Sequence, residues 1–184
     1  MHFWNKNQLE AKTPIHSHAW DFASLLISGS YLHDLFRVID LDEDDKAQIE
    51  KYQKSNNATN IPDHYLGMYK IPKRDNVSGT FRPEWAKNVK TERISRKIEQ
   101  QGSIYFLGMD FPHQITIDLN AVGSMITLVL TSETNRENLY TLQPITRPKT
   151  FENPSPNVDE KIVRNQLEII LDEINKIYSE KDDE

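Results

Sequence analysis

The chain has 184 residues, a length that favours one domain with a short extension and allows a buried core without crosslinks. Its formal net charge is 22 − 28 = −6, which argues against a nucleic-acid partner. Residues 157–184 hold nine acids and four bases, so most of this charge lies at the C-terminal end. Cysteine is absent, which excludes disulfide scaffolds, zinc–thiolate sites, iron–sulfur clusters and cysteine nucleophiles.

The first residues of the chain lack the apolar stretch of a signal peptide, and no apolar run reaches 18 residues. We therefore expect a cytoplasmic protein that uses neither a membrane nor nucleic acid as its partner. Its expected ligand is a small molecule.

Short apolar runs separated by turn residues predict that most of the chain forms strands. Strands at 14–28 and 31–39 are expected to pair as a hairpin closed at Ser28-Gly29-Ser30. Residues 41–54 carry acids early and lysines late, which predicts a short exposed helix. Further strands are expected at 65–71, 89–99, 103–109, 113–118, 125–132 and 139–143. About eight short strands at near-regular spacing indicate a β-sandwich or barrel.

The C-terminal part has a different character. Residues 146–156 contain three prolines and are interpreted as a linker lying against the body. Residues 157–184 are predicted to form an amphipathic helix, with Asn157 as N-cap and Glu160 three residues later. One apolar stripe runs along it, formed by Val163, Leu167, Ile170, Ile174 and Ile177. The stripe either packs against the barrel or forms the seam of a homodimer.

Three histidines form the main candidate site. His16 and His18 are two residues apart, so in a strand their side chains project from the same face. His113 follows Pro112 at the start of a later predicted strand, and an antiparallel barrel can bring it to the other two. Three neutral imidazole nitrogens are suitable ligands for one first-row metal ion. The competing interpretation is structural, with each imidazole hydrogen-bonded inside the core.

The segments HSHAWDFASLLISGSYLHDLF and GSIYFLGMDFPHQITI resemble the two metal-binding motifs of the cupin superfamily. The resemblance covers roughly residues 12–143. It implies a mainly β fold, a cupin-type double-stranded β-helix (jelly-roll barrel), followed here by the C-terminal α-helix. The implied barrel domain spans residues 1–145 and carries an insertion at about 41–88.

On this resemblance His16, His18 and His113 are the metal ligands, and Asp21 is a fourth ligand or an acceptor that orients an imidazole. The run from His16 to Gly29 is similar to the first motif of the thiol dioxygenases, which use three histidines. The chain departs from that family because no arginine precedes Arg37, no histidine follows His113, and cysteine is absent. The resemblance therefore implies a relative among the oxygenase-type cupins.

The expected function is that of a mononuclear non-heme Fe(II) oxygenase or dioxygenase acting on a small polar metabolite, with dioxygen as co-substrate. Manganese, nickel or zinc also suit the same ligands, so a metal-assisted isomerase or lyase is an alternative. A non-catalytic ligand-binding cupin is another. The candidate catalytic residues are His33 and Tyr105, and the candidate substrate contacts are Trp20, Tyr31 and Arg37.

Overall fold

The structure is a computed structural model. The residues it describes are 2–4, 12–54, 61–72, 82–117, 125–134, 139–151, 164–165, 167–172 and 175. In chain order its named elements are β1 (His2–Trp4), β2 (Ile15–His16), β3 (Phe22–Ser28), β4 (Ser30–Asp40), α1 (Glu43–Lys54), β5 (Tyr65–Lys70), β6 (Glu84–Gln100), β7 (Ile104–Leu107), β8 (His113–Ile117), β9 (Met125–Thr131) and β10 (Tyr140–Pro144). The predicted mainly β class is confirmed.

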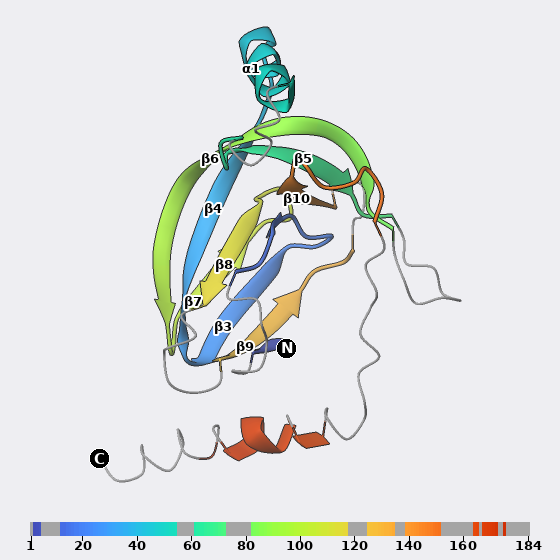
Figure 1. Ribbon diagram of the computed structural model, residues 1–184. Helices are drawn as coiled ribbons and strands as arrows, with labels where there is room; N and C mark the ends of the chain where they lie inside the picture. The colour runs from blue at the N-terminus through green and yellow to red at the C-terminus, as the bar shows by residue number, and fades with distance from the viewer. Residues whose placement is uncertain are drawn as a thin grey trace.

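The strands form two sheets (Figure 1). One is a four-stranded sheet in the order β1-β9-β3-β7, and the other closes into a barrel in the order β10-β2-β8-β4-β6-β5. Every pairing between these strands is antiparallel. The long β6 arches over the barrel and pairs with β4 on one side and β5 on the other (Figure 1).

The predicted hairpin at Gly29 is wrong, because β3 and β4 do not pair with each other. β3 pairs with β7 and β9, whereas β4 pairs with β6 and β8. Gly29 has a φ of 87°, and a Cβ placed there would come within 3.2 Å of the Met125 backbone. Glycine is needed at this corner because it accepts positive φ and close backbone contact, and the chain crosses here from one sheet to the other.

An apolar cluster lies between the four-stranded sheet and the barrel wall. It is formed by Leu26, Tyr31, Ile115 and Met125. Tyr31 belongs to β4 and Ile115 to β8, so these strands turn one face toward the four-stranded sheet. Because side chains alternate along a strand, the other face of β4 and β8 points into the barrel. A second apolar cluster fills part of the barrel around Ile15, Val89 and Leu142.

The outer face of the four-stranded sheet is also apolar. The register aligns Leu130, Ala23 and Phe106 in one row across β9, β3 and β7, and Leu128, Leu25 and Ile104 in the next. Ile104, Phe106 and Leu130 are each about 70% exposed. We call these six residues the outer apolar face.

The segment at 41–88 contributes α1, β5 and the beginning of β6. β5 pairs with both β6 and β10, and it thereby closes the barrel. Residues 146–151, the described part of the predicted linker, lie against the body. Trp85 donates its backbone N–H to Lys149 O at 2.9 Å, and Thr150 forms a bridge with Glu84.

Helical residues in the C-terminal part are described at 164–165, 167–172 and 175, a shorter stretch than the predicted 157–184. Of the predicted stripe, Ile170 is buried and Leu167 is 45% exposed. The predicted cap at Asn157 and the stripe residues Val163, Ile174 and Ile177 fall outside the described residues. Among the described helices, none combines the length and apolar character needed to cross a lipid bilayer.

Candidate metal centre

The three predicted histidines meet at the wall between the barrel and the four-stranded sheet. Strand β2 pairs with β8 at a single position, and that position sets His16 opposite His113. Each of His16, His18 and His113 offers a ring nitrogen, and these three nitrogens all lie within 4.8 Å of one another. His113 is 2% exposed, and His16 and His18 are partly buried.

His18 reaches the cluster from outside a strand, which differs from the sequence expectation. β2 ends at His16, and the chain then turns before β3 begins at Phe22. The Ser17 backbone N–H donates to Tyr140 O at 3.0 Å, and the Tyr140 N–H donates to Ser17 Oγ at 3.0 Å. These bonds anchor the turn to β10. The ring of Phe22 packs edge-on against His18, with centroids 4.7 Å apart.

The ring of His16 is oriented by the backbone. Its Nδ1 lies 2.9 Å from Pro14 O, so Nδ1–H donates to that carbonyl and Nε2 keeps its lone pair. Burial lowers the pKa of His16 more than the Pro14 contact raises it. The imidazole is therefore neutral at neutral pH, which is the state that binds a metal.

The ring of His113 is held from two sides. Its Nε2 lies 2.8 Å from His18 Nε2, and its Nδ1 lies 2.9 Å from His33 Nε2. Two nitrogens bound to one ion at bonds of about 2.1 Å lie roughly 3.0–3.4 Å apart, so the His18–His113 spacing is close to that of a shared ligand pair. Metal-binding histidines commonly use their second nitrogen to contact an orienting group, as His113 does here.

His33, a predicted catalytic residue, contacts a ligand candidate and lies outside the three-nitrogen group. Its Nδ1 is 3.7 Å from Glu99 Oε1, and both side chains are largely buried. Burial lowers the pKa of His33, and the nearby Glu99 carboxylate raises it by a smaller amount. Glu99, His33 and His113 thus form a line of polar groups running from β6 through β4 to β8.

Tyr31 and Tyr105 both pack beside the ring of His33. Tyr31 Oη donates to Tyr105 Oη at 2.9 Å, and the Tyr105 ring centroid is 4.6 Å from that of His33. Burial raises the pKa of both phenols, so both are protonated at neutral pH. Tyr105, the second predicted catalytic residue, packs beside His33 and Phe22 and lies outside the three-nitrogen group.

The other predicted site residues have separate positions. Trp20 packs near His18, with ring centroids 5.9 Å apart. Asp21 accepts the Met109 N–H at 2.7 Å and is not part of the described metal-binding group. Arg37 lies four residues beyond His33 on β4, about 13 Å along an extended strand. There it is 64% exposed and pairs with Glu92 at 3.2 Å, so the structure does not bring it to the histidines.

A cavity of about 240 Å³ adjoins the histidine cluster. His16, Ser17 and His18 form one side of it, and Ile71, Leu139, Thr141 and Phe151 are among its other lining residues. This cavity gives a small ligand a place beside two of the three imidazoles.

Sequence reasoning missed Glu99 as part of the site. Its place depends on the pairing of β6 with β4, which sets Glu99 opposite Tyr31 and Lys97 opposite His33. An acidic residue in a charged strand gives no signal of such a contact until that register is known.

The chain has no match among known protein-family models, curated proteins or solved structures. Three imidazoles whose ring nitrogens lie within 4.8 Å of one another, two of them with Nδ1 already engaged, could hold a metal ion.

Proposed function

We propose that this chain is a cupin-type protein that binds one Fe(II) ion through His16, His18 and His113 and acts as an oxygenase on a small polar metabolite. The observation that carries the proposal is the orientation of two of the ligand candidates. His16 and His113 each have Nδ1 engaged by another group, and His113 Nε2 faces His18 Nε2 at 2.8 Å, so the Nε2 side of His113 is directed toward the other histidines.

The strand connectivity supports the cupin-type fold. With β5 and β10 set aside, the two sheets are β1-β9-β3-β7 and β2-β8-β4-β6. Along the chain these strands alternate between the sheets, except where β4 is followed by its neighbour β6. Two facing four-stranded sheets connected in this way are typical of a jelly roll. In this interpretation β5 and β10 are additions to the jelly roll.

The three imidazole ligands narrow the choice of metal but do not select a single one. Three neutral imidazoles suit iron, nickel, copper and zinc, and they leave the full 2+ charge of the ion uncompensated. When bound, Fe(II) would supply redox and Lewis-acid chemistry at coordination positions that the protein leaves open. We favour iron because the first motif resembles that of the thiol dioxygenases.

The protein's own contribution is orientation and exclusion of water. The Glu99–His33–His113 line fixes the His113 ring, and the Pro14 carbonyl fixes the His16 ring. Phe22 and Tyr105 cover the buried side of the histidines, while the cavity beside His16 and His18 accepts the substrate. His33 acts in this proposal as a positioning residue.

The proposal is tested by loading purified protein anaerobically with Fe(II) and measuring bound iron by elemental analysis. We expect about one iron per chain in the wild type and a loss of at least tenfold in affinity in His16→Ala and His113→Ala. The matched control is His64→Ala, because His64 is exposed and stacks on Tyr65 away from the cluster. Equal iron binding in His113→Ala and the wild type would disprove the metal site.

The oxygenase activity needs a separate measurement. Iron-loaded wild type is screened with small polar metabolites while dioxygen consumption is recorded, and His113→Ala serves as the blank. Substrate-dependent uptake that disappears in the variant supports an oxygenase. Stoichiometric iron without any uptake across the screen would favour the non-catalytic or isomerase alternatives and would leave the metal site standing. A cytoplasmic location and a homodimer remain predictions.

A further inference from the structure

The barrel contains a second cavity, of about 940 Å³, that is separate from the histidine centre. Every barrel strand contributes to its wall, for example Ile15 from β2, Asp34 from β4, Tyr65 from β5, Arg93 from β6, Gln114 from β8 and Leu142 from β10. Cavities of roughly 300–1,000 Å³ are typical of small-molecule sites. This cavity is therefore large enough for a metabolite.

One sheet wall separates the two sites. Asp34 follows His33 on β4, and Gln114 follows His113 on β8, so alternation sends each pair to opposite faces. The register sets Asp34 opposite Gln114, and both side chains are buried on the barrel side. A ligand in the barrel would therefore contact the back of the strands that carry His33 and His113.

The mouth of the cavity carries an excess of positive charge. Among the described residues, its lining includes the cations Lys12, Arg93, Arg96 and Arg147 and two carboxylates, those of Asp34 and Asp63. Arg96 is already committed, because its Nε and Nη2 each donate to Asp34 at 2.7 Å. The Arg96 guanidinium accordingly holds the pKa of Asp34 below its ordinary value, and Asp34 is ionised at neutral pH.

Of the other three cations, Arg93 pairs with Asp34 at 3.9 Å, and the charge of Lys12 helps to lower the Asp34 pKa from a longer distance. Among the described residues, neither Lys12 nor Arg147 has a carboxylate within 4.0 Å. Arg147 is nevertheless held in place, because Nη1 donates to Gln143 Oε1 at 2.8 Å and the guanidinium stacks 3.9 Å above the Phe151 ring. An ordered guanidinium without an acidic partner is suited to receive a carboxylate.

The floor of the cavity is apolar. Ile15, Phe36, Leu66 and Leu142 line it and also belong to the barrel's apolar cluster. A ligand that fits both ends needs an anionic head at the mouth and an apolar body against this floor.

We propose that the closed barrel binds an amphipathic carboxylate, with its head at Lys12, Arg93 and Arg147 and its apolar body against Ile15, Leu66 and Leu142. The class includes alkyl and arylalkyl carboxylates. The site shares no side chain with the three-histidine cluster, and Pro14 and Gln143 line both this cavity and the smaller one beside His16 and His18.

The test uses decanoate as the probe and isothermal titration calorimetry on the full-length protein. We expect saturable binding of one decanoate per chain, and a dissociation constant at least tenfold higher in the Lys12→Gln/Arg147→Gln double variant. Lys87→Gln is the matched control, because Lys87 pairs with Asp40 outside the cavity and its loss should leave decanoate binding unchanged. Circular dichroism establishes that each variant is folded.

Two further probes separate the proposal from simpler explanations. Decylammonium has the same chain and the opposite charge, and binding as tight as that of decanoate would overturn the requirement for an anion. NMR spectra that record both the backbone amides and the arginine Nε–Hε groups should show decanoate-induced shifts at Arg93 and Arg147. Shifts confined to the outer apolar face, around Phe106 and Leu130, would also overturn the proposal. So would wild-type affinity in the double variant.

Discussion

His33 acts on the proposed metal centre through the 2.9 Å contact between its Nε2 and His113 Nδ1. If His113 binds the ion through Nε2, its Nδ1 carries the proton. His33 Nε2 then accepts the hydrogen bond from this Nδ1–H group. The Glu99 carboxylate, 3.7 Å from His33 Nδ1, favours the matching tautomer of His33. His33, a candidate catalytic residue, is thus placed to orient His113, and this role can be tested separately from catalysis.

Replacing His33 with leucine should remove the acceptor for His113 Nδ1–H and weaken metal binding about 10–100-fold, the usual effect of losing such an outer contact. Glutamine at the same position can still accept that hydrogen bond, so His33→Gln should recover part of the affinity. The measurement is a metal-binding titration on variants with unchanged circular dichroism spectra. Unchanged affinity in His33→Leu would contradict the orienting role.

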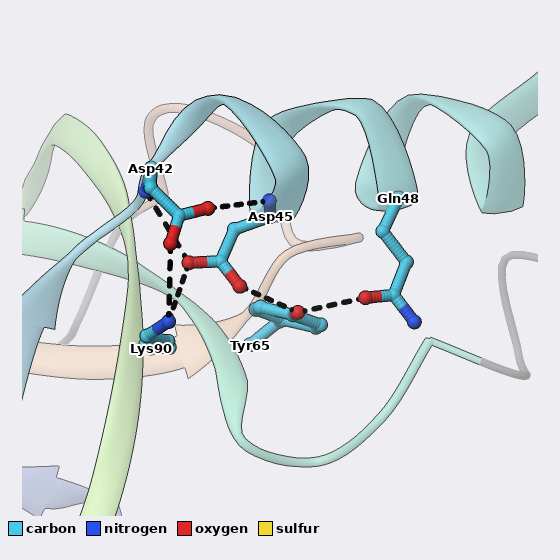
Figure 2. A network of polar contacts seen from close by, with 5 residues as sticks. All are labelled: Asp42, Asp45, Gln48, Tyr65 and Lys90. Carbon is cyan, nitrogen blue, oxygen red and sulfur yellow. Dashed lines mark hydrogen bonds and ion pairs between the residues drawn. The ribbon is translucent and has the colours of Figure 1, made fainter.

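At the scale of the element, helix α1 is attached to the barrel by a polar network (Figure 2). Asp42 caps the helix by accepting the Asp45 N–H at 2.8 Å, and Asp45 Oδ2 accepts the Asp42 N–H at 3.2 Å. This reciprocal pair is a capping box with aspartate in the third helical position. Asp45 also accepts from Lys90 Nζ at 2.6 Å and from Tyr65 Oη at 2.9 Å, which connects α1 to β6 and β5.

Replacing Asp45 with alanine should destabilise the protein at neutral pH, since it removes the cap partner and both barrel contacts. The Lys90 hydrogen bond is the largest cause that lowers the pKa of Asp45 to about 2, below an unfolded value of about 3.9. A lowered carboxyl pKa stabilises the fold above the unfolded value, and this contribution is lost as pH falls from about 4 to about 2. The difference in melting temperature between wild type and Asp45→Ala should therefore shrink over that range.

The control for this prediction is Asp44→Ala. Asp44 lies in the same first helical turn but is exposed, whereas Asp45 is buried. A melting temperature equally lowered in both variants would indicate an effect of helix charge alone and would contradict the attachment of α1 through Asp45.

At the scale of the whole molecule, the proposed ion joins segments distant in sequence, residues 16–18 and residue 113. An ion bound only by the folded state stabilises it by about 2.7 kcal/mol at a free concentration 100 times its dissociation constant. For a chain of this length that corresponds to roughly 5–10 °C in melting temperature. Calorimetry of metal-loaded protein with and without chelator should show this decrease, and His113→Ala should not respond to the chelator.

Local chemistry predicted much of the structure. Short apolar runs between turn residues predict the strands at 113–118 and 125–132, which agree with β8 and β9. Acids early and lysines late located α1. The three histidines were identified because the i, i+2 spacing and the Pro112-His113 strand start are visible in the sequence itself.

Tertiary structure decided which strands pair, and with them the surroundings of the site. Gly29 reads in sequence as a hairpin turn, but pairing sends β3 and β4 to different sheets. Glu99 joins His33 only through the β4–β6 register, and the barrel cavity exists only because β5 closes onto β10. Turn residues and capping depend on neighbours along the chain, whereas pairing depends on contacts between distant segments. The sequence alone therefore identified the three candidate ligands, and the fold supplied the groups that orient them.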